Sequence, residues 1–561
     1  MTDAPRNLLE QHFEIAFAAP DGIKKLRELI LTLAMQGKLV EQDPTDQPAS
    51  ELVKEIESEK QRLAKAGGVR IPKPLPQITE QEMTHEIPES WVWVRFGGIA
   101  QHNSGKTLDK GRNTGQPRDY ITTSNLYWGR FELDNVRQML IRDDELEKCT
   151  AKKDDLLICE GGEAGRAAVW HFDTEVCFQN HVHRARFYKS IDPYFAQRFF
   201  EKLNATGEID QYRKGVGISN MSSKALASIA FPLPPISEQH RIVARIGQLM
   251  ARCDALETLR KERKEKRQAV HAAAIQQLLE VKDGAAWGFV EQHFGELYTA
   301  KENVTELRKA ILQLAVMGRL VPQDPNDPPA SELLREIDIE KQRLVKAGKI
   351  KAPKPLPPIK PEEVPYQLPQ GWAWVRLEDV STKIHYGYTA SADHGTKNIR
   401  LLRITDIQDN KVDWETVPGC DAKKEDVGQY LLADNDILIA RTGGTVGKSY
   451  LVKGVNIDAV FASYLIRIVP STSLDVRFVK YFAESPLYWE QLYAACSGTG
   501  QPNVNGTSLS QLLLALPPLP EQHRIVARID QLMALCDTLE QKISDATDRQ
   551  TELLHAVMAQ V

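Results

Sequence analysis

Apolar residues recur with helical spacing near the start of each half of the chain. One run, at 26–37, is LRELILTLAMQG, and another, at 307–318, is LRKAILQLAVMG. Both place apolar residues three and four positions apart, and both end on a glycine, which commonly follows the last turn of a helix. The pattern predicts one helix in each run, ending at Gly37 and at Gly318.

A second amphipathic helix is predicted shortly after each of these. Apolar residues share one helical face at positions 52, 56 and 63, and again at 333, 337 and 344. Ser50 and Ser331 are the predicted N-caps, because a serine hydroxyl can accept a hydrogen bond from a free amide of the first turn. Alternating prolines then follow at 72, 74 and 76 and at 353, 355 and 357. They predict a stiff extended connector, with a docking site for a proline-binding module as the less favoured alternative.

Two longer helices are predicted from apolar stripes with alternating spacings of four and three. The stripes comprise Ile242, Ile246, Leu249, Cys253 and Leu256 in the first helix and Ile525, Ile529, Leu532, Cys536 and Leu539 in the second. Such spacing is typical of a coiled coil, so the two helices are predicted to pair with each other. A helix from about 237 to 282 would be roughly 70 Å long.

Between these helical regions the pattern changes to short β-rich runs broken by Gly, Asn and Asp. It does so from Trp91 to about Phe231 and from Trp372 to about Leu516. The two segments share only sparse echoes, such as DLLICEGGEAGR and DILIARTGGTVGK, or GVGISNMSSKAL and GTGQPNVNGTSL. We expect two compact mixed domains with one common fold.

The helical regions are an internal repeat. Residues 22–96 recur at 303–377 with an offset of 281, and residues 234–257 recur at 517–540 with an offset of 283. The helices are therefore repeated closely while the segments between them diverge. A repeated scaffold with varied inserts is typical of a protein that reads two different sites.

Composition limits the remaining possibilities. The 561 residues have a formal net charge of −5 and a pI near 6.3, so any nucleic-acid surface must be a local patch. No signal peptide or membrane segment is recognisable, and we expect a cytoplasmic protein. The seven cysteines form no zinc-binding spacing, so no structural metal is expected.

Motifs for catalysis or nucleotide binding are missing or incomplete. The run RTGGTVGKS at 441–449 ends like a phosphate-binding loop, but Thr442 stands where that loop needs a glycine. Neither half has the setting of a dinucleotide or S-adenosylmethionine site, and no Asn-Pro-Pro-aromatic methylation motif is present. His181 and His183 alternate along a predicted strand, and we favour DNA contact or surface polarity over a metal site there.

Two pairs of motifs identify a family. LPPISEQHRIVARI recurs as LPPLPEQHRIVARI, and IPESWVWVRFGGIA has its counterpart in LPQGWAWVRLEDVS. With the GGTVGK turn, they resemble the specificity subunit of a type I restriction-modification system over essentially the whole chain. The resemblance implies a non-catalytic subunit with two target recognition domains, each of which reads half of a split, asymmetric double-stranded DNA target. It implies that the repeated helices set the spacing and bind two methyltransferase subunits, with ATP-driven restriction subunits joining the complex. S-adenosylmethionine, ATP and Mg would then be bound by those partners.

The predicted fold class is α+β, with two mixed α/β recognition domains separated by long repeated helices that form an antiparallel coiled coil with pseudo-twofold symmetry. The predicted segments are a helical region and proline connector at 1–88, a recognition domain at 89–231, a helical spacer at 232–369, a second recognition domain at 370–516 and a C-terminal coiled-coil helix at 517–561.

Candidate DNA contacts follow from the family likeness and from the side chains that suit base edges, with Arg or Lys for guanine and Asn or Gln for adenine. In the first domain they are Lys106, Lys110, Arg112, Thr122, Thr123, Ser124, Asn125, Arg166, His181, His183, Arg184, Lys214, Ser219 and Asn220. In the second they are Tyr386, Tyr388, Arg403, Thr405, Asp406, Arg441, Thr442, Lys448, Gln501, Asn503 and Asn505. The predicted partner-binding residues are Glu238, Gln239, His240 and Arg241 with their repeats Glu521, Gln522, His523 and Arg524.

Three alternatives stay open at this point. The basic run LRKERKEKRQ at 259–268 is favoured as a solvated helix face, with a contact to DNA phosphates as the second possibility. A non-enzymatic assembly scaffold is the main alternative function. A self-contained DNA methyltransferase or nuclease is disfavoured, because the sequence lacks the corresponding motifs.

Overall fold

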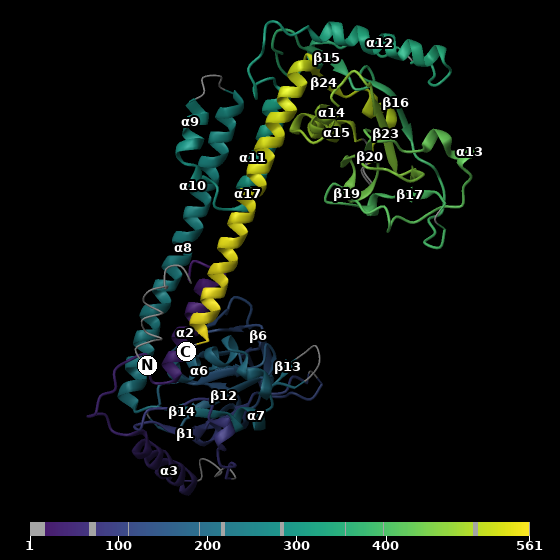
Figure 1. The fold of residues 1–561 in the computed structure, drawn as a ribbon. Helices are drawn as coiled ribbons and strands as arrows, with labels where there is room; N and C mark the ends of the chain where they lie inside the picture. Colours follow the sequence, from purple (N-terminus) through teal and green to yellow (C-terminus); the bar gives the residue numbers. More distant parts are fainter. Residues whose placement is uncertain are drawn as a thin grey trace. The chain divides into compact units, whose positions relative to one another are not determined.

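The computed structural model describes residues 17–66, 74–109, 111–189, 191–214, 219–280, 285–353, 355–396, 398–496 and 503–559 (Figure 1). The chain divides into two compact units. Unit 1 comprises Met1–Arg263 and Ala546–Val561, and unit 2 comprises Lys264–Asp545. No helix among the described residues is long and apolar enough to cross a membrane.

Unit 1 begins with the two helices that periodicity predicts, α2 (Gly22–Met35) and α3 (Ala49–Lys65). Gly37 follows α2 with a φ of +69°, which confirms its predicted place after the last turn. The predicted cap is wrong, because α3 starts at Ala49 and its N-cap is Pro48. The Ala49 amide instead donates to the Ser90 carbonyl at 2.9 Å, so a tertiary contact replaces the side-chain cap.

The first recognition domain has two four-stranded sheets in the orders β10-β8-β12-β2 and β6-β3-β11-β7. A short pair at its base joins β1 (Val92–Arg95) antiparallel to β14 (Ala230–Leu233). The sheet strands are β2 (Ala100–Ser104), β3 (Gln116–Ile121), β6 (Arg137–Ile141), β7 (Thr150–Ala151), β8 (Leu156–Cys159), β10 (Ala167–Val169), β11 (Val176–Phe178) and β12 (Val182–Phe187). The remaining elements are α4 (Phe96–Ile99), α5 (Leu146–Cys149), α6 (Pro193–Ala205), α7 (Ser223–Ser228), β4 (Leu126–Tyr127), β5 (Arg130–Phe131), β9 (Gly161–Gly162) and β13 (Ser219–Asn220).

Unit 2 repeats this plan. Its helices α11 (Lys301–Val316) and α12 (Ala330–Lys346) correspond to α2 and α3, and α12 is likewise capped by Pro329 and not by Ser331. Its strands are β15 (Ala373–Arg376), β16 (Ser381–Tyr386), β17 (Arg400–Leu402), β18 (Ile407–Gln408), β19 (Lys411–Val412), β20 (Ile437–Ala440), β21 (Ser449–Leu451), β22 (Ala459–Phe461), β23 (Leu465–Pro470) and β24 (Leu513–Leu516). Its other helices are α9 (Ala285–Gln292), α10 (Phe294–Leu297), α13 (Lys424–Val427), α14 (Val476–Phe482), α15 (Pro486–Ala495) and α16 (Gly506–Ser510).

Strand pairing confirms that the divergent inserts share one fold. In both domains a central strand, β12 or β23, pairs antiparallel with two neighbours, which are β2 and β8 or β16 and β20. In both a parallel pair lies beside it, β3 with β11 or β17 with β22. Arg184 of β12 lies opposite Leu157, and Arg467 of β23 lies opposite Leu438. The strand registers of the two domains therefore match, although their amino-acid sequences are barely similar.

The long helices are α8 (Ile236–Glu280) and α17 (Leu519–Met558), close to their predicted extents. In unit 1 the stripe of α8 packs against α2. In unit 2 the stripe of α17 shares one apolar cluster with α11 and with Ala274 and Leu278 of α8, in agreement with the predicted pairing of the two long helices. In unit 1, α8 contacts α2, and Arg27 of α2 forms ion pairs with Asp254 and Glu257 at 2.5 and 2.9 Å. In unit 2, Arg308 of α11 pairs with the repeat residues of α17 at 2.7 and 3.2 Å.

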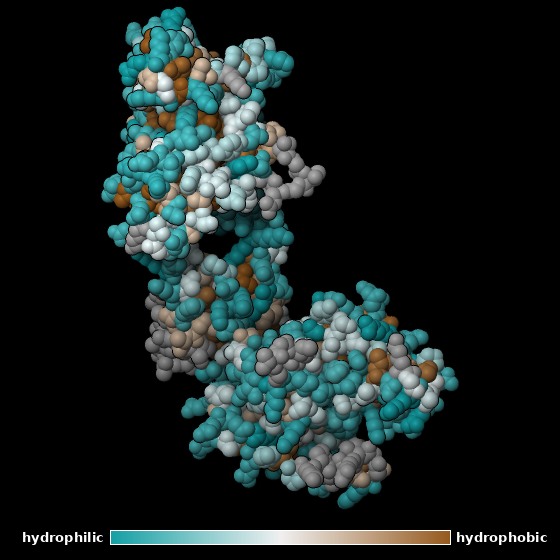
Figure 2. All heavy atoms as spheres, turned by 90° about the vertical axis from the view of Figure 1, so that its right-hand side faces the viewer, coloured by the Kyte–Doolittle hydropathy of each residue, from teal (hydrophilic) through white to brown (hydrophobic). Residues whose placement is uncertain are grey.

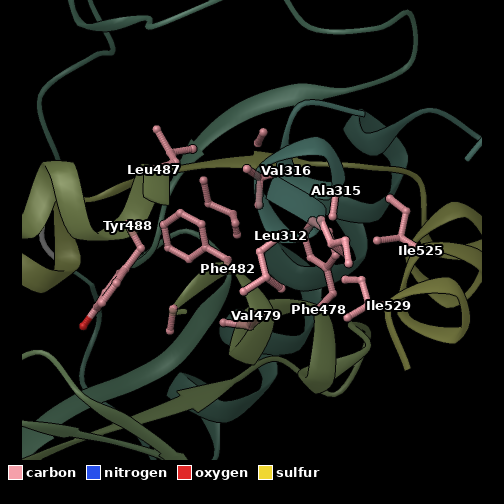
Figure 3. Packing of buried hydrophobic residues seen from close by; sticks show 14 of the residues in the cluster. Leu312, Ala315, Val316, Phe478, Val479, Phe482, Leu487, Tyr488, Ile525 and Ile529 are labelled. Carbon is pink, nitrogen blue, oxygen red and sulfur yellow. The ribbon is translucent and has the colours of Figure 1, made fainter. Parts of the chain in front are cut away.

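Figure 3 shows how α17 enters the core of unit 2. Ile525 and Ile529 of α17 lie beside Ala315 of α11 and Phe478 of α14, and all four side chains are buried. One apolar cluster therefore connects the helices to the recognition domain. Because burial of each such side chain contributes about 1.5–3 kcal/mol, this cluster is a main source of the unit's stability.

A buried histidine makes one part of unit 2 sensitive to acid. His271 of α8 is 3% exposed, and its ring packs on Tyr298 with centroids 5.1 Å apart. Burial lowers its pKa below the usual 6.5, and Glu306 opposes this shift only in part. With the offset of 283, the corresponding residue of unit 1 is Leu554, which is also buried.

We expect His271→Leu to reduce the acid sensitivity of unit 2. The folded state holds this imidazole neutral, whereas the unfolded chain takes up a proton near its pKa of 6.5. Stability is thus fully present above that pH and falls as the pH is lowered, by at most about 1.4 kcal/mol per unit. Denaturant unfolding at pH 7.5 and 5.5 measures this loss in both proteins. An unchanged loss in the variant would exclude His271 as its source.

Candidate nucleic-acid interface

In the first domain, segments from three parts of the chain meet at one end of the sheet. The turn between β8 and β10 contains β9, which pairs with β13 so that Ser219 lies opposite Gly162 and Asn220 opposite Gly161. The amide of Glu160 donates to the carbonyl of His181 at 2.8 Å, which fixes the turn before β12 to the same place. His181 and Asn220 are exposed at this end. The structure thus brings together residues that lie about 40 positions apart in the sequence.

Arg166 connects this group to a further predicted turn. Its guanidinium donates to the Thr123 carbonyl at 2.6 Å and lies 5.1 Å from the centre of the Tyr127 ring. Arg130 lies over the same ring at 4.8 Å. Tyr127 was not among the sequence candidates, since nothing in the sequence indicates that two arginines meet on its ring. Each arginine also pairs with a carboxylate, Arg166 with Glu163 at 3.1 Å and Arg130 with Glu132 at 2.7 Å, so the ring contacts and ion pairs together fix the geometry of both side chains.

Four first-domain candidates lie inside the domain. Thr122 and Asn125 are buried and bond to each other, with the Asn125 Oδ1 accepting from the Thr122 amide at 3.0 Å. Arg184 is 1% exposed and donates to the carbonyls of Glu147 and Thr150. His183 is 1% exposed, and burial lowers its pKa. In this structure these side chains hold the turns in place and present no group to a ligand, which corrects the prediction of direct contact.

The other first-domain candidates lie on or near the surface. Arg112 has a side chain 89% exposed, whereas Lys106 is paired with Glu145. Thr123 is partly buried, and Ser124 and Lys214 are exposed. Lys110 lies outside the described residues, and so does the side chain of Ser219. We keep the exposed members as predicted DNA contacts.

The second domain forms a comparable group around Arg441. Its guanidinium lies 4.8 Å from the centre of the Tyr386 ring, and its Nε donates to the Asn503 Oδ1 at 3.3 Å. The Tyr386 hydroxyl accepts from the Gly506 amide at 2.9 Å, and Thr442 forms a β-bridge with Asn503. The predicted Tyr386, Arg441, Thr442 and Asn503 therefore belong to one surface.

The remaining second-domain candidates separate into exposed and paired groups. Lys448, Thr405 and Asn505 are exposed, and the Asn505 side chain caps α16 by accepting from the Ser508 amide at 2.8 Å. Arg403 and Asp406 bind each other at 2.8 Å, so their charges are compensated within the domain. Tyr388 is partly buried against Tyr430, and Gln501 lies outside the described residues.

The repeated Glu-Gln-His-Arg run forms a buried joint. The Glu238 carboxylate is 1% exposed and accepts from the Trp91 indole at 2.9 Å and from Gln42 at 2.5 Å. Burial raises its pKa, and these two hydrogen bonds oppose the rise. Gln239 is fully buried and accepts from the Asp192 amide at 2.9 Å. The joint therefore fixes the first turn of α8 to the entrance of the recognition domain.

Unit 2 has the same joint. Glu521 accepts from the Trp372 indole at 2.9 Å and from Gln323 at 3.1 Å, and Gln522 accepts from the Asp475 amide at 3.1 Å. The prediction that these glutamates and glutamines face a partner is corrected, because all four are buried and bonded within the chain.

The last two residues of each run lie nearer the surface. His240 and His523 are exposed. Arg241 pairs with Asp46, and Arg524 pairs with Asp327, each at 2.7 Å with the guanidinium about one third exposed. These histidines and arginines stay predicted partner contacts.

The basic run on α8 is partly engaged. Lys261, Lys264 and Lys266 are exposed, whereas Arg260 donates to the Phe17 carbonyl and Arg267 to the Thr299 hydroxyl.

Figure 2 shows one face of the molecule, on which hydrophilic residues predominate and apolar residues occur in small groups.

Comparisons with known proteins agree on one family. The model of the type I restriction modification DNA specificity domain matches residues 88–265 and again residues 369–547. The specificity subunit of the type I restriction enzyme EcoAI from Escherichia coli is 32% identical, over 96% of this chain and 93% of that protein. The EcoEI specificity subunit, also from Escherichia coli, is 31% identical over the same shares. The crystal structure of the HsdS subunit from Thermoanaerobacter tengcongensis covers 85% of this chain and 98% of its own, with 16% identity and a TM-score of 0.45.

Proposed function

The chain belongs to the type I restriction-modification DNA specificity family, and from this premise we propose that its two recognition domains each bind one half of a split, asymmetric double-stranded DNA target. It is a non-catalytic specificity subunit that directs the enzyme to a specific DNA sequence. The observation that carries the proposal is that the two domains share one pattern of strand pairing but have different residues on their turns.

The group around Arg166 in the first domain and that around Arg441 in the second support this division. Each holds an arginine over a tyrosine ring, at 5.1 Å and 4.8 Å, next to exposed polar side chains. Arginine and asparagine are side chains that distinguish bases in the major groove. Because the exposed residues differ between the domains, the two half-sites are expected to differ as well.

The repeated helices are the proposed binding regions for two modification subunits. Each unit offers the same exposed histidine, His240 or His523, next to the same ion pair, whose arginine is about one third exposed. Two equal surfaces on one chain suit two copies of one partner. We place S-adenosylmethionine on those modification subunits, and ATP and Mg on restriction subunits that join the complex.

Methylation in cells tests the proposal directly. When the chain is co-expressed with its cognate modification subunit, we expect N6-methyladenine in plasmid DNA at two short half-sites separated by a fixed gap. Cells with the modification subunit alone should lack these marks, since they lack the subunit that recognises sequence. Single-molecule sequencing of the plasmid gives both results. Marks that do not depend on this chain would refute the proposal and favour an assembly scaffold.

A further inference from the structure

An exposed aromatic ring stands at the same point of each recognition domain. His181 directly precedes β12, and Tyr464 directly precedes β23. His181 is exposed, and Tyr464 is 62% exposed. His181 is among the residues predicted to contact DNA, and Tyr464 is not.

Backbone hydrogen bonds establish that the two positions are equivalent. The carbonyl of His181 accepts from the Glu160 amide at 2.8 Å, and the carbonyl of Tyr464 accepts from the Arg441 amide at 2.9 Å. The following residue, Val182 or Leu465, accepts in both domains from a glycine amide at 3.2 Å. The turn is thus built alike in both domains, while the side chain at its tip differs.

Residues suited to nucleic acid adjoin Tyr464. Its backbone is tied to Arg441, whose guanidinium lies over Tyr386 and bonds to Asn503. Lys448, on the same turn as Arg441, is exposed. Packing inside the protein does not explain why a tyrosine occupies position 464, because most of the surface of this residue is open to solvent.

We propose that Tyr464 is a specificity-determining residue of the second recognition domain, and that its ring contacts the edge of one base in that domain's half-site. This inference rests on the proposed function and deepens it. An aromatic ring suits apolar contact with the methyl group of thymine, whereas the ring nitrogens of His181 suit hydrogen-bonding groups. The same turn thereby gives the two domains different base preferences.

The experiment is the methylation sequencing described above, with Tyr464→Ala in the assembled complex. We expect one base position in one half-site to lose discrimination by about tenfold, because a good base contact distinguishes bases by that order. The other half-site should be unchanged. Tyr464→Phe should keep the preference, since it keeps the ring.

Two further variants complete the test. His181→Ala should relax a position in the opposite half-site. Ile457→Ala, in the same domain as Tyr464, should change nothing, because this 38% exposed side chain precedes β22 at the far end of the strands. An unaltered target for Tyr464→Ala, with normal methylation, would overturn the inference and leave the proposed function standing. Failure of the unsubstituted chain to direct methylation would instead overturn the proposed function.

Discussion

Replacing Trp91 by alanine is expected to destabilise unit 1 by about 3–5 kcal/mol, the usual cost of truncating a buried tryptophan. Trp91 is 4% exposed, and its indole donates to a carboxylate oxygen of Glu238 at 2.9 Å. The substitution leaves a cavity and removes one of the two hydrogen bonds that compensate a buried carboxylate. Hydrogen exchange of the whole chain, followed peptide by peptide, measures the loss of protection in each unit.

Two variants separate the causes. Trp91→Phe keeps most of the ring but removes the donor, so it should cost about 1–3 kcal/mol, the penalty for leaving a buried acceptor unpaired. Trp372→Ala, the counterpart in the repeat, should weaken unit 2 and leave unit 1 as it was, since distant sites contribute independently. Equal loss of protection in both units from Trp91→Ala would contradict this account of the joint.

The helices could be predicted from sequence because their signals are local. The spacing of apolar residues and the position of Gly37 fix where α2 lies and where it ends, and α8 and α17 follow in the same way. The pairing of the two long helices was predicted, but the packing of the α8 stripe against α2 was not. A stripe such as Ile242 and Ile246 identifies which face of the helix is buried. It does not identify which of the other apolar helices covers that face, because this depends on the tertiary structure.

The functional residues were harder to assign for a related reason. Glu238 and Gln239 are polar and repeated, as a partner surface would be, yet a buried hydrogen-bonded joint needs the same residue types. Arg184 likewise looked like a DNA contact, although it satisfies backbone carbonyls inside the domain. By contrast, the equivalence of Tyr464 and His181 was open to detection, because FQNHVHR and FASYLIR align without a gap.

A buried ion pair in the second recognition domain gives the other large expected effect. Asp436 binds Arg467 at 2.7 Å, and their side chains are 3% and 11% exposed. Burial raises the pKa of Asp436, and Arg467 opposes the rise. Arg467 also donates to the Leu431 carbonyl at 2.8 Å, so its position is fixed. Asp436→Ala would leave this guanidinium buried without its counter-charge, at an expected cost of about 3–5 kcal/mol.

The first domain provides a related ion pair for comparison, although the strand position of Arg467 is occupied there by Arg184. Asp155 binds Arg186 at 2.6 Å, but the Arg186 side chain is 28% exposed and can be hydrated when its partner is lost. Asp155→Ala should therefore cost less than Asp436→Ala. Replacing both members, as Asp436→Leu with Arg467→Met, should recover most of the stability, because no uncompensated charge remains. Unfolding in denaturant gives the three values. If the double variant were as unstable as Asp436→Ala, packing of these side chains, and not the buried charge, would determine the loss.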